Sequence, residues 1–198
     1  MRRKKPIELL TAEEVALLIN AASRRAPSGL RDRALIALLY WAQLRVGEAL
    51  SLLPHHIDLE DLRVTVVGKG SRHRVAAIHP AARPHLEAWS DRRRQLRLGA
   101  KSPYLCTISR GKSLRPGDPL NARDVRAMLR RRAETAGIDK RVHPHALRHS
   151  GAAALLRRGV NVRHIQTQLG HASLNTTATY LDSISPDERA QAVQSIDW

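Results

Sequence analysis

Histidine and arginine side chains cluster in the segment 143–149, which reads His-Pro-His-Ala-Leu-Arg-His. His145 and His149 are four positions apart, like the two zinc-binding histidines that one class of metalloproteases carries on a helix. That class needs a glutamate directly after the first histidine as general base, and Ala146 stands there. No third ligand lies nearby in the sequence. We therefore expect no metal, and we expect His149 to pack with its ring bonded to the backbone.

A second segment whose residues could do chemistry, in this case phosphate binding, is Gly68-Lys69-Gly70-Ser71. A nucleotide-binding P-loop needs a glycine five positions before Gly68 and a serine or threonine directly after the lysine, but Arg63 and Gly70 occupy these positions. Apolar residues flank the segment on both sides in a pattern that is typical of two strands. We therefore predict a β-hairpin whose glycine-rich turn carries Lys69.

Two further side chains, Arg45 and Tyr180, are candidates because of the residues next to them in the sequence. Arg45 lies between apolar segments, so we expect it to be mostly buried, and Glu48 can pair with it; a purely structural ion pair explains both equally well. Tyr180 follows His171 by nine positions and lies among threonines, in a stretch that does not obviously bury an aromatic ring. By itself, packing is the simpler interpretation of this tyrosine.

Charge gives the strongest indication of a partner. Lys and Arg number 34 against 18 Asp and Glu, so the formal net charge is +16. A surplus of this size attracts polyanions, and the planar guanidinium suits bidentate phosphate contacts. With one cysteine no internal disulfide can form, and no apolar run approaches the roughly 20 residues of a membrane helix. These features indicate a soluble intracellular protein that binds nucleic acid, and they disfavour a membrane surface.

The elements that must position these residues are mostly helical, because phenylalanine is absent and the remaining apolar residues favour helices. Caps, glycines and prolines predict helices over 11–22, from the 27–29 turn to about 42, over 46–52, from Pro80 and Pro84 to about 96, and over 121–136, 144–159 and 161–170. Residues 62–78 predict a hairpin and 104–107 a third strand, while further helices are expected around Tyr180 and from Ser185. The prediction is one α+β domain over 1–198, with a small three-stranded antiparallel sheet.

In chain order, these segments resemble the catalytic domain of the tyrosine recombinases, the phage integrase family. The shared pieces are Gln-Leu-Arg-Val-Gly-Glu at 43–48, the glycine-lysine hairpin, His145-x-x-Arg148, and Leu-Gly-His at 169–171 followed by Tyr180. Each piece is modest alone, but the ordered set is highly specific, and it spans about residues 8–182.

The resemblance implies a role for each of these residues. Arg45 and Arg148 would grip the non-bridging oxygens of the scissile phosphate, with a hydrogen bond from His171, and Glu48 would hold Arg45 in place. The family usually has glycine two positions before its first arginine. Gln43 stands there in this chain, a departure that affects the turn before Arg45 without removing the arginine.

The resemblance also implies a nucleophile and its proton partners. Tyr180 would attack the phosphate, and because a phenol has a pKa of about 10, His145 would assist by accepting its proton. Lys69 would protonate the departing 5′ oxygen. The 3′-phosphotyrosine keeps the energy of the broken bond, so neither a metal, a cofactor nor ATP is expected.

The implied partner is double-stranded DNA, bound by a homotetramer in the cytoplasm at the bacterial nucleoid. The tail 185–198 would dock on a neighbouring subunit, although packing on its own domain explains Ile196 and Trp198 nearly as well. Further phosphate contacts are expected from a set of arginines, for each of which solvation is an equally good interpretation: Arg72, Arg74, Arg126, Arg130 and Arg131. Neither the target site nor an accessory DNA-bending protein can be identified from the sequence.

Two alternatives stay open on the same residues. A type IB topoisomerase-like enzyme would use the same chemistry to relax supercoils, and a catalytically silent DNA-binding regulator could share the fold. The family usually carries an N-terminal helical domain that completes a clamp around DNA, and no room for one exists before Thr11. We therefore expect either a naturally short protein or a truncated chain.

Overall fold

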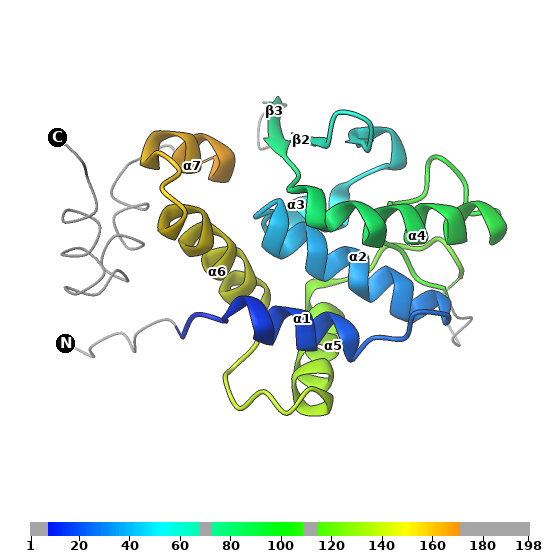
Figure 1. Cartoon of the computed structure of the whole chain (residues 1–198). Coiled ribbons are helices and arrows are strands. Elements are labelled where there is room, and N and C mark those ends of the chain that lie inside the picture. The colour runs from blue at the N-terminus through cyan, green and yellow to red at the C-terminus, as the bar shows by residue number, and fades with distance from the viewer. Residues whose placement is uncertain (1–7, 68–72, 109–114, 171–198) are drawn as a thin grey trace, which may run out of the picture.

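The structure is a computed structural model that describes residues 8–67, 73–108 and 115–170 (Figure 1). In chain order its elements are α1 (Ala12–Asn20), α2 (Pro27–Trp41), α3 (Val46–Ser51), the 3-10 helix η1 (Pro54–His56), β1 (Ile57–Asp58), β2 (Arg63–Val67), β3 (His73–Ala77), the 3-10 helix η3 (Pro80–Ala82), α4 (Arg83–Gln95), α5 (Ala122–Thr135), α6 (Pro144–Arg157) and α7 (Val162–Leu169). The predicted α+β class with a small antiparallel sheet is confirmed. The helices expected around Tyr180 and from Ser185 lie outside the described residues.

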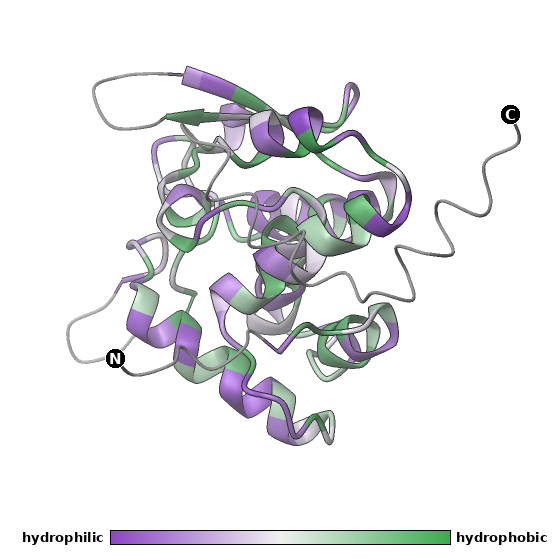
Figure 2. Ribbon diagram, turned by 90° about the vertical axis from the view of Figure 1, so that its left-hand side faces the viewer, coloured by the Kyte–Doolittle hydropathy of each residue, from purple (hydrophilic) through white to green (hydrophobic). Residues whose placement is uncertain are grey.

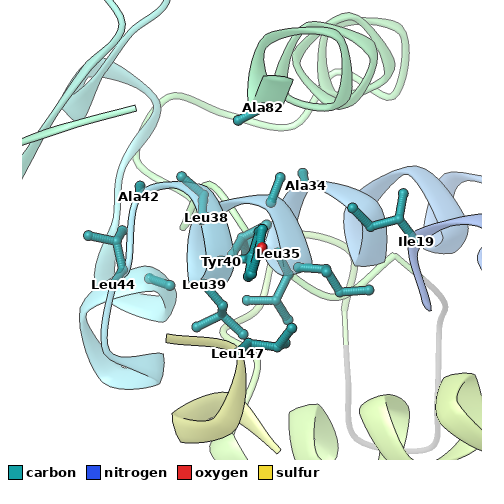
Figure 3. Close-up of a cluster of buried hydrophobic side chains, with 14 of the residues drawn as sticks. Ile19, Ala34, Leu35, Leu38, Leu39, Tyr40, Ala42, Leu44, Ala82 and Leu147 are labelled. Atoms are coloured by element: carbon teal, nitrogen blue, oxygen red, sulfur yellow. The ribbon is translucent and has the colours of Figure 1, made fainter. Parts of the chain in front are cut away.

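Helix α2 is the centre of the core, as its sequence predicts. It packs against α1, α3, α4 and α6, and its residues 34–40 are all buried. Figure 3 shows side chains leaving α2 in several directions, with Leu147 of α6 on one side and Ala82 on another. Because fully burying a leucine contributes roughly 1.5–3 kcal/mol, this helix anchors the elements that carry the site.

Helices α1, α4, α5 and α7 bury one face, and several of the helices begin or end at the expected signals. Along α5 the buried positions are Val125, Met128, Leu129 and Ala133, an amphipathic spacing, and helical ribbons in Figure 2 alternate between hydrophilic and hydrophobic residues. Thr11 and Glu14 form the predicted capping box at α1. Gly170 ends α7 in the left-handed conformation with φ 61°.

The start of α2 differs from the sequence prediction. Pro27-Ser28-Gly29 forms the first turn of the helix rather than a turn before it, because proline suits the first helical position, where its missing N–H costs nothing. Gly29 fits there because the chain at Ser23 lies so close that a Cβ would stand 2.3 Å from the Ser23 carbonyl oxygen.

The sheet has three antiparallel strands in the order β1-β2-β3, but the third strand is not the predicted one. Ile57 pairs with Val64, so β1 precedes the hairpin, and Val64 pairs in turn with Ala76 of β3. The segment 104–107 makes a single bridge, between Cys106 and Pro119. It cannot extend the sheet because its backbone bonds elsewhere: Tyr104 N–H donates to the Leu52 carbonyl at 2.6 Å.

Within the three described segments, no helix is both long enough and apolar enough to cross a membrane.

Candidate active site

Three arginines from separate parts of the sequence meet at the carboxylate of Glu48, which lies in the first turn of α3. Arg45 directly precedes α3, Arg74 lies on β3, and Arg148 lies on α6. The N–O distances to Glu48 are 2.8 Å from Arg45, 2.9 Å from Arg74 and 3.5 Å from Arg148. We call these four residues the Glu48 cluster. Three guanidinium groups against one carboxylate leave it with two net positive charges.

Glu48 is held in its ionised form. Burial acts to raise its pKa, but the hydrogen bond from the Arg45 backbone N–H and the charges of Arg74 and Arg45 outweigh burial, so the pKa lies below its ordinary value. That backbone bond joins Arg45 N to Glu48 Oε2 at 2.7 Å. Glu48 therefore bonds to both the backbone and the side chain of Arg45, and their ion pair is the one that the sequence spacing suggested.

The same three arginines also bind the C-terminal end of α7. Arg74 donates to the Gln168 carbonyl at 2.8 Å, Arg148 to the Leu169 carbonyl at 2.6 Å, and Arg45 to the Gly170 carbonyl at 3.4 Å. The last carbonyls of a helix lack partners within the helix and carry partial negative charge, so cations are favoured there. The point at which the chain continues toward residue 171 is thus fixed against the cluster.

Arg148 lies at the bottom of the site, with 3% of its side chain exposed. It donates to the Gln43 carbonyl at 2.7 Å, beneath the turn between α2 and α3. Helix α6 reaches this position by crossing α2 at Gly151, where a Cβ would stand 2.0 Å from the Tyr40 carbonyl oxygen. The small residue permits the close crossing that brings Arg148 under the turn.

Arg45 is more accessible than its sequence environment predicts. Its side chain is only partly buried, with 42% exposed against 12% for Glu48. Arg45 caps the start of α3 at the surface and its neighbour Leu44 is the residue that enters the core. The exposed guanidinium can meet a ligand from solvent.

The turn before Arg45 explains the departure at Gln43. Gln43 has φ 48°, the left-handed region in which glycine is favoured and a larger residue costs about 1 kcal/mol. Its side chain offsets this cost by donating to the Tyr40 carbonyl at 2.6 Å and accepting from Gln168 at 3.0 Å. The turn thus keeps the backbone conformation of a glycine while carrying a glutamine, and Arg45 stays in place.

His145 is exposed and lies near the positive charges of the cluster. Burial and then the charges of Arg148, Arg45 and Arg126 lower its pKa below 6.5, so the ring is neutral at neutral pH and can accept a proton. The His149 ring, 6.2 Å away between centroids, has its pKa lowered to about 4 chiefly by burial. Among the residues that the structure describes, no three His, Cys, Asp or Glu side chains gather as metal ligands would.

The other predicted site residues have three outcomes. Lys69, Arg72, His171 and Tyr180 lie outside the described residues, as does the tail 185–198. Arg126, Arg130 and Arg131 are exposed on α5, as a DNA-contacting surface requires. Arg74 does not lie on an open face: 20% of its side chain is exposed, and its guanidinium is engaged by Glu48 and α7.

Sequence reasoning missed Gln168, which joins α7 to β3 and to the α2–α3 turn. Its side chain accepts from Ala77 N–H at 2.9 Å and donates to the Ala77 carbonyl at 2.8 Å, completing the unpaired edge of β3. It also donates to the Ala42 carbonyl at 3.2 Å. Nothing in the sequence distinguishes this glutamine from Gln166, because its partners, chiefly backbone groups, lie about 90 and 126 positions away.

Comparisons with known proteins agree with this geometry. Residues 8–185 match the family model described as the phage integrase family. The chain is 36% identical over 176 residues to tyrosine recombinase XerD of Corynebacterium glutamicum, covering 87% of this chain and 56% of that protein. It is also 36% identical over 184 residues to tyrosine recombinase XerC of Xylella fastidiosa, covering 90% and 56%. The chain thus spans a little over half the length of these relatives.

Solved structures give the same result. The XerA recombinase superposes with a TM-score of 0.79 at 26% identity, covering 99% of this chain and 68% of that one. The XerH site-specific recombinase, in a post-cleavage complex with its palindromic difH substrate, superposes with a TM-score of 0.76 at 26% identity, covering 97% and 54%. With the family model matching nearly the whole chain, this protein belongs to the phage integrase family.

Proposed function

We propose that this chain, as a single catalytic domain over residues 1–198, acts in site-specific DNA recombination by cutting and rejoining strands through a 3′-phosphotyrosine at Tyr180. The observation that carries the proposal is the Glu48 cluster, in which Arg45 and Arg148 meet although more than a hundred positions separate them. Membership of a family whose matched relatives are tyrosine recombinases supports the same chemistry.

The cluster supplies what phosphodiester cleavage requires. The phosphate is anionic, so an oxygen nucleophile is repelled unless cations lie where charge builds up in the transition state. Arg45 would bind a non-bridging oxygen from the accessible side, and Arg148 would stabilise the growing charge from beneath, with His171 adding a hydrogen bond. Glu48 keeps Arg45 in position for this contact.

The family resemblance assigns the proton transfers, and the lowered pKa of His145 supports its part in them. In the first step the Tyr180 oxygen bonds to phosphorus, the bond from phosphorus to the 5′ oxygen breaks, and neutral His145 takes the phenol proton. Lys69, in the segment between β2 and β3, gives a proton to the 5′ oxygen. Attack by a second 5′ hydroxyl reverses these steps and releases Tyr180, and no energy source is consumed.

The proposed partner is double-stranded DNA, held at two sites by a tetramer in which the tail 185–198 contacts a neighbouring subunit. Arg72, Arg126 and Arg130 would contact the DNA backbone. With a net charge of +16, binding will depend steeply on salt. The proposed location is the cytoplasm, at the nucleoid.

A duplex selected by its binding to the protein, from a pool of nicked DNA duplexes with a randomised centre, tests the proposal. Cleavage near the nick releases a short strand and leaves the protein bound covalently to the DNA. With labelled DNA, we expect a protein–DNA adduct that survives denaturing electrophoresis. Tyr180→Phe should abolish the adduct and keep DNA binding. Tyr40→Phe is the matched control, because Tyr40 is buried in the core and should leave the adduct unchanged. An adduct that persists in Tyr180→Phe contradicts the proposal.

The two alternative functions give other outcomes with the selected duplex. A silent DNA-binding regulator would bind it without forming an adduct. A topoisomerase-like enzyme would form the adduct and relax supercoiled DNA, but would form no Holliday junction between two copies of the site. A Holliday junction is the result we expect.

A further inference from the structure

Arg74 connects three parts of the active site that are distant in sequence. It lies on β3, and its two η nitrogens bond in different directions: Nη2 to Glu48 Oε2 at 2.9 Å, and Nη1 to the Gln168 carbonyl at 2.8 Å. With 20% of its side chain exposed, it lies inside the site rather than on the DNA-facing surface that its position in the sequence suggests.

Arg74 also sets the path of the chain beyond α7. Gly170 has φ 61°, and a Cβ on it would stand 2.6 Å from Arg74 Nε and 2.8 Å from Arg74 Cδ. The backbone therefore passes directly against the Arg74 side chain at the last residue before His171. Only glycine satisfies both the left-handed conformation and this close approach.

The geometry of the guanidinium suits this task and that of a lysine does not. The planar fork of arginine holds two acceptors at a fixed angle, whereas an ammonium is a single point of charge on a flexible stem. Glu48 Oε2 is shared by Arg45 N at 2.7 Å, Arg74 at 2.9 Å and Arg148 at 3.5 Å. If one of these donors is lost, the Glu48 carboxylate is free to shift toward the remaining donors. Arg45, which Glu48 holds, would then shift with it.

We propose that Arg74 is a positioning residue of this active site, which holds Glu48 and the end of α7 in register so that Arg45 and Arg148 meet the same phosphate. This inference rests on the proposed function. It replaces the expectation that Arg74 contacts the DNA backbone.

The test separates positioning from DNA contact by measuring two quantities for Arg74→Gln with the duplex selected above. The first is the slope of log affinity against log salt, and the second is the single-turnover rate of adduct formation at saturating duplex. We expect an unchanged slope and a rate lowered about 100-fold, because displacement of a catalytic group by about 1 Å has an effect of this size. Arg74→Lys should restore less than a tenth of the lost rate.

Two arginines serve as controls. Arg63→Gln removes an exposed arginine from the neighbouring strand β2 and should leave the rate unchanged. Arg130→Gln removes an exposed arginine of α5 and should reduce the slope by about 0.9, the value for one phosphate contact. If Arg74→Gln instead reduces the slope by this amount and keeps the rate at saturation, Arg74 is a DNA contact and the inference is wrong.

A readout without activity distinguishes failure of this inference from failure of the proposed function. In urea, Glu48→Gln should lower the unfolding midpoint more in the wild type than in the Arg74→Gln background, because the two side chains are coupled. Equal shifts would overturn the inference even if the wild type forms adducts. A wild type that forms no adduct would overturn the proposed function and the catalytic meaning of Arg74 with it, while the coupling still reports whether Arg74 holds Glu48.

Discussion

Within the described residues, two carboxylates that are largely shielded from solvent each bind more than one arginine, and they differ in the net charge that remains after pairing. Asp32 on α2 accepts from Arg31 at 2.9 Å and from Arg132 at 2.9 Å, a group that we call the Asp32 cluster. Glu48 contacts three arginines, as described above. The Asp32 cluster keeps one net positive charge and the Glu48 cluster keeps two.

The remaining donors of the two clusters have different targets. In the Asp32 cluster, Arg31 donates to the Cys106 carbonyl at 3.2 Å and Arg132 to the Ala21 carbonyl at 3.1 Å, which joins α2 and α5 to segments on either side. In the Glu48 cluster the donors collect at the end of α7, and Arg45 stays 42% exposed. No arginine of the Asp32 cluster is more than 26% exposed, whereas the Glu48 cluster keeps both the larger excess of charge and the more accessible member.

The largest effect that tests this comparison is expected for Arg148→Lys. The substitution keeps the positive charge but loses the fork that reaches Gln43 and Leu169, so the transition-state contact is misplaced. We expect adduct formation at saturating DNA to fall by about 100- to 1,000-fold, the range for loss of one preorganised donor. A loss smaller than tenfold would mean that Arg148 acts only as a structural arginine, like those of the Asp32 cluster.

The substitution that tests the Asp32 cluster is Arg132→Gln. It removes a charge-assisted hydrogen bond to Asp32 from a side chain that is 26% exposed, while Arg31 continues to neutralise the carboxylate. We expect the free energy of unfolding, measured in urea, to fall by about 1–2 kcal/mol. The adduct rate of the folded protein should stay at the wild-type value, and a large drop in rate would remove the distinction between the two clusters.

The sequence predicted the parts of this fold that depend on local signals. Helix starts and ends follow from Thr11, Asn121, Asn161 and Gly170, whose capping contacts lie within four positions. The third strand was predicted wrongly because its identity depends on pairing with another strand and not on local signals. Strand β1 is two residues long and is recognisable only through its pairing with β2, whereas the apolar run 104–107 meets the criteria of a strand and uses its backbone bonds for packing.

The candidate site shows the same division. The resemblance to the tyrosine recombinases, carried by residue types and their order, was enough to predict Arg45, Glu48 and Arg148 as one group. The inward position of Arg74 could not be predicted, because the alternation of a strand says which face a side chain takes but not that α7 covers that face. The high exposure of Arg45 was missed for a related reason: apolar neighbours in sequence, such as Leu44, can enter the core while the residue between them stays at the surface.

The smallest expected effect concerns the positive charges around His145, which come from Arg148, Arg45 and Arg126. Because the pKa of His145 lies below 6.5 through burial and the charges of Arg148, Arg45 and Arg126, and because only the neutral ring accepts a proton, adduct formation should decline with falling pH only below 6.5. Arg126→Gln removes one of these charges and should move the acid limb to higher pH. Arg132→Gln, whose charge belongs to the Asp32 cluster, should leave the limb where it is. Rates at saturating DNA across pH 4.5–8 make the measurement, and an acid limb that Arg126→Gln leaves unmoved would mean that the limb does not report His145 and that His145 is not the group that accepts the proton.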